Sequence, residues 1–235
     1  MAKIKSVYVN PKYSQLKEFM KEFPTHWDNN EGKVIYKGRN ELREMEIGGI
    51  TIVVKSFCKP NFINQLVYGV FRSSKARRSF EYAQMLLDHG IGTPEPVAYY
   101  TERKGIFFDR SFYACLKSEC PYTYAHLMNG DYPNQEKVLR AIAQLTARIH
   151  ELGWIHKDYS RGNILFKDTP KEVILEIIDL NRIRFQKVTM ERGCKNFERL
   201  PGTPEMLRIL AEEYAKARGF NTEKCYELIS TNREK

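Results

Sequence analysis

The chain has 235 residues, of which 42% are hydrophobic and 29% charged, and this ordinary globular composition excludes a largely disordered protein. The length suits one compact domain or two small lobes. The net charge of +9 predicts anionic partners such as nucleotides, phosphorylated sugars, nucleic acid or an acidic membrane, and does not choose among them.

The five cysteines are odd in number and form no C-x-x-C pair, so neither a disulfide framework nor a zinc ribbon is expected. The N-terminal residues 1–5 are not followed by an apolar signal core, and no apolar run is long enough to span a bilayer. We therefore expect a cytoplasmic protein, and leave open a peripheral contact with the inner face of the cytoplasmic membrane.

The first thirty residues predict a peripheral segment with one short helix, Lys12 to Phe23, ended by the following proline. Two or three antiparallel strands with tight turns are predicted next, the clearest over residues 33–37 and 50–57, with a polar stretch between them. Because side chains alternate between the faces of a strand, Lys55 shares a face with Val53, at the end of an otherwise apolar strand.

Residues 59–78 combine apolar side chains at helical spacing with cations at both ends. A helix is predicted from Ser74 to His89, and a glycine follows it as a plausible helix terminator. A turn then leads to two strands, over 97–100 and 106–117.

The clearest helix covers residues 135–152, where apolar residues keep a spacing of alternately four and three. A polar loop over 156–163 and two strands, 164–166 and 173–178, come next. A helix over 203–218 opens with Thr-Pro and is closed by a glycine.

This order, strands first and helices second, predicts an α+β fold of two lobes with a cleft where they meet. We expect a β-rich N-lobe over residues 1–118, including a basic insertion at 59–78, and a small helical C-lobe over 119–235. The two lobes together form one domain.

Three oxygen-bearing residues stand out in the C-lobe. Asp158 and Asn163 lie in the loop behind the long helix, and Asp179 ends the apolar strand that follows. Phosphoryl transfer from ATP uses such groups: a carboxylate and an amide hold Mg²⁺, and a second carboxylate orients the attacking hydroxyl. The alternative is that they are turn residues, which are common after helices.

The whole constellation resembles the protein-kinase fold family. Ile52-Val53-Val54-Lys55 resembles its V-A-I-K strand, His156-Lys157-Asp158 followed by Asn163 its H-R-D-x-x-x-x-N loop, and Ile178-Asp179-Leu180-Asn181 its D-F-G. The resemblance implies that Lys55 holds the ATP phosphates and Glu81 positions Lys55. It makes Asp158 the catalytic base, with Asn163 and Asp179 as Mg²⁺ ligands.

The resemblance also assigns Val53, Gly38 and Glu119, with Lys55, to the ATP site. The departures from the family are informative, because there is no G-x-G-x-x-G loop and Lys157 replaces an arginine that receives a phosphorylated activation loop. Few residues follow Asp179, too few for a full peptide-binding lobe. These departures favour an acceptor that is not a peptide.

Within this superfamily the chain resembles the lipopolysaccharide core kinases of Gram-negative bacteria. The features that carry this resemblance are the catalytic loop followed by Ile164-Leu165-Phe166, the segment Ile178 to Arg182, the turn Gly92 to Val97, the small size and the basic insertion. It implies an ATP-dependent, Mg²⁺-dependent kinase that phosphorylates Kdo or heptose of the inner core, with a lipid A-linked glycolipid as acceptor.

The basic insertion fits a protein that works on such an acceptor. An apolar helix with cationic ends can lie on an anionic membrane, and the alternative is that it packs on the N-lobe. Six cations are candidates for binding the acceptor or the transferring phosphoryl group: Arg72, Lys75, Arg77, Arg78, Arg161 and Arg182. A structural role remains the alternative for each.

Three other functions stay open. The chain resembles, less closely, an atypical (RIO-like) protein kinase or an antibiotic phosphotransferase, and it is also compatible with a pseudokinase that binds without turnover. A nucleic-acid partner rests on charge alone and is not expected. The sequence gives no oligomeric state.

Overall fold

The computed structural model describes residues 3–58, 73–104, 107–128 and 132–231. The chain divides into two compact units. The first comprises Met1–Asp88 with Pro94–Lys117, and the second comprises His89–Thr93 with Ser118–Lys235. Each unit is described by itself below.

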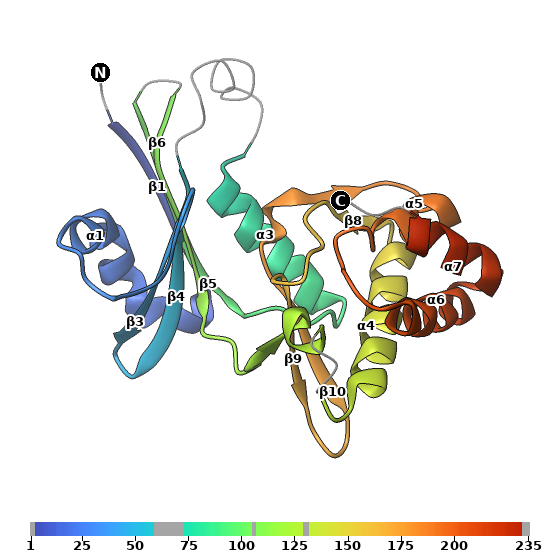
Figure 1. The fold of residues 1–235 in the computed structure, drawn as a ribbon. Coiled ribbons are helices and arrows are strands. Elements are labelled where there is room, and N and C mark those ends of the chain that lie inside the picture. The colour runs from blue at the N-terminus through green and yellow to red at the C-terminus, as the bar shows by residue number, and fades with distance from the viewer. Residues whose placement is uncertain (1–2, 59–72, 105–106, 129–131, 232–235) are drawn as a thin grey trace. The chain divides into compact units, whose positions relative to one another are not determined.

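The first unit is built on a six-stranded antiparallel sheet with the order β1-β5-β6-β4-β3-β2 (Figure 1). Its strands are β1 (Lys3–Val9), β2 (Lys33–Lys37), β3 (Glu41–Ile47), β4 (Ile50–Ser56), β5 (Pro96–Lys104) and β6 (Phe107–Leu116). The strands predicted from 33–37, 50–57, 97–100 and 106–117 are confirmed within a few residues, except that β5 extends further.

The N-terminal segment is more than peripheral, and our prediction there was wrong. Residues 3–9 add the edge strand β1 to the sheet, and the 3₁₀ helix η1 (Pro11–Leu16) leads into α1 (Lys17–Asp28), which continues through Pro24. Met20 and Phe23 of α1 are fully buried against the sheet. Burying two such side chains contributes about 1.5–3 kcal/mol each, which offsets the roughly 3 kcal/mol that an internal proline costs.

Helices α1 and α3 (Lys75–Asp88) cover opposite faces of this sheet. Tyr100 belongs to the core cluster under α1, whereas the ring of Tyr99, its neighbour in β5, lies 5.7 Å from the ring of Phe80 in α3. Because successive strand residues point to opposite faces, the two tyrosines mark the two sides. The helix predicted from Ser74 to His89 is confirmed as α3.

The second unit holds most of the helices. They are α4 (Gln135–Glu151), α5 (Met190–Lys195), α6 (Pro204–Arg218) and α7 (Thr222–Thr231), with the short 3₁₀ helices η2 (Tyr124–Leu127) and η3 (Leu180–Arg182). Its small sheets are β10-β9-β7 and β11-β8, formed by β7 (Tyr122–Thr123), β8 (Trp154–His156), β9 (Ile164–Asp168), β10 (Val173–Ile177) and β11 (Ile183–Phe185).

Helix α4 packs against α6, and Val138, Ile142 and Ile149 of its predicted apolar stripe are buried. Leu145 is half-buried, and Leu152 follows the end of the helix and is exposed. The ends of α6 are also as predicted. The hydroxyl of Thr203 accepts a hydrogen bond from the Met206 N–H (3.3 Å), and Gly219 adopts a positive φ of 64° after the last turn.

The segment His89–Thr93 belongs to the second unit because it is bound there by β10. The Ile177 N–H donates to the Gly92 carbonyl (2.9 Å), and the Gly92 Cα faces the Leu175 carbonyl so closely that a side chain would overlap it.

In the parts of the chain that the structure describes, no helix combines the length and the apolar character needed to cross a membrane.

Candidate active site

The loop 156–163 connects β8 to β9 and is fixed by the imidazole of His156. This buried ring accepts a hydrogen bond from the Asp158 N–H at Nδ1 (3.1 Å), so its Nε2 carries the proton and donates to the Ile178 carbonyl (3.0 Å). Burial lowers the pKa of His156 and favours this neutral form. His156 therefore ties the loop to the segment before Asp179.

Asn163 joins the same two segments from the other end of the loop. Its side-chain Nδ2 donates to the Asp158 carbonyl (2.8 Å), and its backbone carbonyl accepts from the Ile178 N–H (3.0 Å). These bonds bring Asp158, Asn163 and Asp179 into one small region, which the turn-residue interpretation does not require. The local arrangement follows from the β9-β10 hairpin, which places residue 163 opposite residue 178.

Asp179 adopts a left-handed backbone conformation, with φ 59° and ψ 46°. Few residues other than glycine tolerate this region, and aspartate and asparagine are the usual exceptions. One carboxylate oxygen accepts a hydrogen bond from Nδ2 of Asn181 (2.6 Å). The carboxylate of Asp179 and the amide oxygen of Asn163 are hard oxygen donors, the kind that Mg²⁺ prefers, so this donor set fits the cation.

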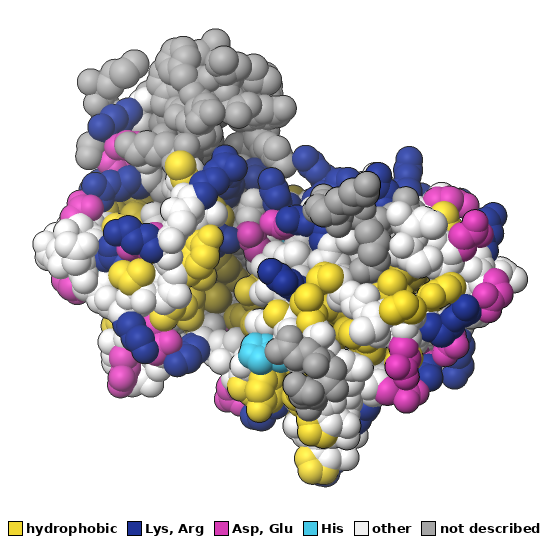
Figure 2. Space-filling model, in the orientation of Figure 1, with side chains coloured by type: hydrophobic (Ala, Val, Ile, Leu, Met, Phe, Trp, Pro, Cys, Tyr) yellow, Lys and Arg dark blue, Asp and Glu magenta, His cyan; other side chains and the backbone are white. Residues whose placement is uncertain are grey.

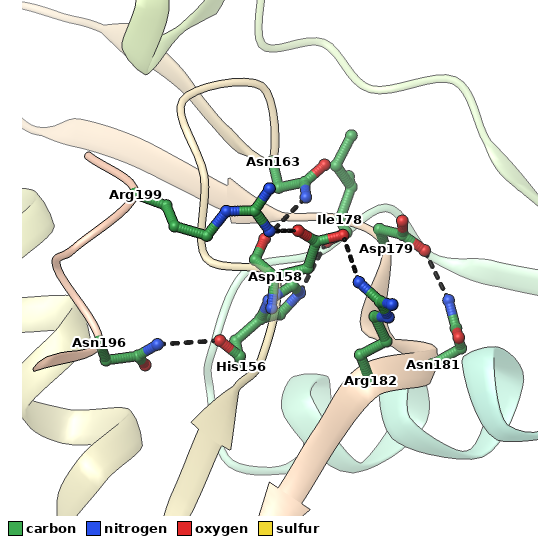
Figure 3. Close-up of polar contacts among 9 residues, drawn as sticks. All are labelled: His156, Asp158, Asn163, Ile178, Asp179, Asn181, Arg182, Asn196 and Arg199. Carbon is green, nitrogen blue, oxygen red and sulfur yellow. Dashed lines mark hydrogen bonds and ion pairs between the residues drawn. The ribbon is translucent and has the colours of Figure 1, made fainter. Parts of the chain in front are cut away.

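Two arginines bind the carboxylate of Asp158, as Figure 3 shows. Nη1 of Arg182 lies 3.3 Å from Oδ2, and Nη1 of Arg199 forms an ion pair with Oδ1. Arg182 was a candidate from the sequence, but Arg199 was not. No sequence signal pointed to Arg199, because it lies 41 residues from Asp158 and outside every motif.

A buried chain of hydrogen bonds connects the start of the loop 156–163 to helices α4 and α6. Arg218 donates to the hydroxyl of Tyr214 (3.1 Å), which donates to Nδ1 of His150 (2.9 Å). Nε2 of His150 donates to Oδ1 of Asn196 (3.0 Å), whose Nδ2 donates to the His156 carbonyl (2.9 Å). Burial lowers the pKa of His150 to about 4, so the ring is neutral, as these directions require.

In the first unit, Lys55 lies on β4 with its ammonium 5.3 Å from the ring of Phe57. Ile52 and Val54 are buried in the core under α1, so Val53 and Lys55 face the other side of the sheet, the side that α3 covers. This alternation is the one predicted from the sequence.

Glu81 lies on α3, on that same side of the sheet. It forms an ion pair with Arg77 one turn earlier (2.6 Å), so its pairing with Lys55 remains a prediction. The guanidinium of Arg77 has its pKa raised by this carboxylate.

The remaining candidates lie in several places. Gly38 is exposed in the turn between β2 and β3, and Glu119 is exposed with its carboxylate 3.5 Å from Nζ of Lys167. Arg161 is exposed in the loop 156–163 and contacts the sulfur of Met128.

The cations of the insertion differ from one another. Lys75 lies 6.0 Å from the Phe57 ring centre, and the buried Arg78 donates to the Ser73 carbonyl at the start of α3. Arg72 and most of the insertion, residues 59–72, lie outside the described residues.

A β-rich unit with a strand lysine and a helical unit with this loop define a protein-kinase-like fold. The solved structure "WaaP in complex with acyl carrier protein" shares it: the TM-score is 0.65, and the match covers 96% of this chain and 95% of that one at 15% identity. The predicted α+β, two-lobed fold is thereby confirmed.

The family is shown by sequence. The model of the lipopolysaccharide kinase (Kdo/WaaP) family matches residues 43–216, and the chain belongs to this family. It is also 26% identical over 153 residues to the 3-deoxy-D-manno-octulosonic acid kinase of Vibrio vulnificus (strain YJ016). That match covers 60% of this chain and 62% of the relative, so it spans less than two thirds of the relative's length.

Proposed function

We propose that this chain transfers the terminal phosphoryl group of ATP to a hydroxyl of Kdo, the 3-deoxy-D-manno-octulosonic acid of the lipopolysaccharide core. The observation that carries the proposal is the joining of Asp158, Asn163 and Asp179 by the bonds through Ile178 and the catalytic loop. Membership in the Kdo/WaaP family supports the kinase activity, and the named activity of the relative supports Kdo over other core sugars.

Each residue has a defined task in this proposal. Asp158 binds the acceptor hydroxyl and takes its proton, while Asn163 and Asp179 hold Mg²⁺ through their side-chain oxygens. Bound Mg·ATP supplies the phosphoryl group, and its cation neutralises charge on the phosphate oxygens. The loop residues are held in place before any ligand binds, which is the preorganisation that electrostatic catalysis needs.

The first unit contributes the ATP-binding lysine. Lys55 holds the α- and β-phosphates, and Glu81, on the helix that covers the same face of the sheet, positions it. For that pairing Glu81 must exchange its present partner, Arg77, for Lys55. Their ion pair is exposed, and such pairs contribute only about 0–1 kcal/mol, so the exchange costs little.

The acceptor is anionic and carried by a lipid, which suits a basic protein. In Figure 2, Lys and Arg side chains line much of the upper edge of the part that holds α4 to α7. We propose a peripheral encounter with the inner face of the cytoplasmic membrane. A membrane contact through residues 59–78 stays a prediction, and residues 59–72 of that segment lie outside the described residues.

The test is incubation of the protein with labelled ATP, Mg²⁺ and Kdo–lipid A, followed by mass spectrometry of the glycolipid. The expected product carries one added phosphoryl group on Kdo. A parallel reaction with a core that also carries heptose decides between the two sugars. Phosphorylation of heptose alone contradicts the choice of Kdo but keeps the enzyme class.

The variant Asp158→Asn tests the site itself. It should lose phosphoryl transfer while it still folds and binds Mg·ATP. The matched control is Asp168→Asn, which removes a carboxylate of the same unit that serves structurally, through Lys137 (2.6 Å) and Asn134. Undiminished turnover by Asp158→Asn would contradict the assignment.

A further inference from the structure

Both oxygens of the Asp158 carboxylate are occupied by guanidinium groups. Arg199 binds Oδ1 and Arg182 binds Oδ2 (Figure 3). The side chain of Asp158 is 19% exposed, whereas those of Arg199 and Arg182 are 36% and 55% exposed. The two arginines therefore present their outer surfaces to solvent while they hold the carboxylate between them.

Arg199 lies in a segment, residues 196–200, that is held in place by buried side chains and hydrogen bonds. Phe197 and Leu200, on either side of it, are fully buried, and Asn196 is bound to both His150 and the His156 carbonyl. The ring of Phe197 packs against those of Tyr159 and Tyr214. A segment anchored this firmly fixes where the guanidinium of Arg199 can reach.

This arrangement has a consequence for the reaction proposed above. An acceptor hydroxyl must form a hydrogen bond to Asp158 before it can lose its proton there. It therefore competes with two guanidinium groups for the same oxygens. A guanidinium that gives up this carboxylate can bind another anion, and a planar carboxylate matches its paired N–H donors.

We propose that Arg199 and Arg182 form the binding site for an acidic group of the acceptor, and that binding of this group frees Asp158 for the acceptor hydroxyl. Arg199 is then a residue that determines specificity for a sugar acid over a neutral sugar. The inference rests on the proposed function and names the chemistry by which that site recognises its acceptor.

The position of the two arginines favours the acceptor over ATP as the source of the anion. Both contact Asp158, the residue that meets the acceptor hydroxyl in the proposed function.

The test compares a sugar-acid acceptor with its analogue in which the carboxylate is reduced to a hydroxymethyl group. Steady-state kinetics are measured for the wild-type chain, Arg199→Gln and Arg199→Lys. Arg199→Gln should raise the KM of the acid acceptor about 10- to 100-fold, leave the KM of ATP unchanged and remove most of the preference for the acid. Arg199→Lys should retain part of that preference, because it keeps the charge but not the planar donors.

The matched control is Arg208→Gln, which removes one positive charge from the same unit at an exposed ion pair with Glu223. It should preserve the preference for the acid. Equal discrimination by wild type and Arg199→Gln would overturn the inference while the proposed function stands. A change confined to the KM of ATP would also overturn it and assign Arg199 to the nucleotide.

A binding measurement separates this inference from the proposed function. The methyl glycoside of the sugar acid and its reduced analogue are titrated into wild type and Arg199→Gln, with binding followed by NMR. Arg199-dependent binding of the acid supports the inference even if no acceptor is phosphorylated. Absence of any preference for the acid in wild type overturns it.

Discussion

Nε2 of His150 lies 3.0 Å from Oδ1 of Asn196, and this bond joins the end of α4 to the segment that carries Arg199. Through Nδ2 of Asn196 the connection continues to the His156 carbonyl, at the start of the loop 156–163. A buried, neutral imidazole thus holds two parts of the site to the helical core. Protonation of His150 should therefore lower the stability of the fold and change the geometry around Asp158.

The first prediction concerns the pH dependence of stability. Burial lowers the pKa of His150 from its ordinary value of 6.5 to about 4, so between these values the unfolded chain binds a proton that the folded chain does not. The free energy of unfolding should therefore fall as the pH falls from about 6.5 to about 4, by on the order of 3 kcal/mol from this group. Urea unfolding of wild type and His150→Gln at several pH values measures it.

The variant should lose stability less steeply over that range, although it is less stable at neutral pH. The free energy of unfolding of the variant should still depend on pH in part, because burial also lowers the pKa of His156. Identical slopes in wild type and His150→Gln would show that His150 is not the titrating group.

The second prediction concerns Gly193 in α5. A Cβ at this position would overlap the hydroxyl of Tyr214 and lie 3.2 Å from Nδ1 of His150. Gly193→Ala should therefore destabilise the fold by about 1–3 kcal/mol, despite the roughly 1 kcal/mol that alanine contributes to a helix. Thermal or urea unfolding measures this.

A double-mutant cycle with Tyr214→Phe identifies the cause. Without the hydroxyl the alanine fits better, so Gly193→Ala should cost less in that background. Gly162→Ala is the control, since a Cβ there meets nothing within 4 Å. An equal cost of Gly193→Ala in both backgrounds would exclude the overlap with the hydroxyl as the reason.

The third prediction separates backbone tolerance from chemistry at Asp179. Asparagine accepts the left-handed conformation and can keep the bond from Asn181, so Asp179→Asn should retain the melting temperature. Because it removes the charge that we propose holds Mg²⁺, phosphoryl transfer should fall at least about 100-fold. Asp179→Val should in addition unfold at lower temperature, since a β-branched residue is strained at this φ.

The fourth prediction tests Lys55. Lys55→Met keeps most of the side-chain volume and removes the charge, so the fold should persist while transfer falls about 100-fold, with the KM of the acceptor little changed. Lys21→Met, which removes an exposed lysine paired with Glu18 on α1, is the matched control. Full activity of Lys55→Met at limiting ATP would remove Lys55 from the nucleotide site.

The sequence predicted those parts of the molecule in which local pattern and burial agree. The stripe of α4 and the Thr203 and Gly219 ends of α6 were predicted because spacing and capping act over a few residues. Asp158, Asn163 and Asp179 could be grouped because a catalytic-loop pattern and one hairpin connect them.

The sequence failed where distant contacts decide. Pro24 stops an isolated helix, but burial of Phe23 against the sheet outweighs the proline, and nothing local reports that burial. Arg199 reaches Asp158 only because buried neighbours and Asn196 fix its segment, and these contacts join residues that are far apart along the chain. The ion pair of Glu81 with Arg77 was also not predicted, because the kinase motif names only the partner of Glu81 in the ATP site and not its neighbours on the helix.

The hydrogen bond from the Ile177 N–H to the Gly92 carbonyl also bears on how this protein can be expressed and studied. It binds residues 89–93 into the helical unit, although residues on both sides of that segment belong to the β-rich unit. A single cut therefore cannot divide the chain into two intact halves. A fragment that stops at residue 117 would carry the detached segment without its binding partner, and a fragment that starts at residue 118 would leave the edge of β10 exposed to aggregation. Expression of either half alone should give poorly soluble material, and mutational work is best done on the whole chain.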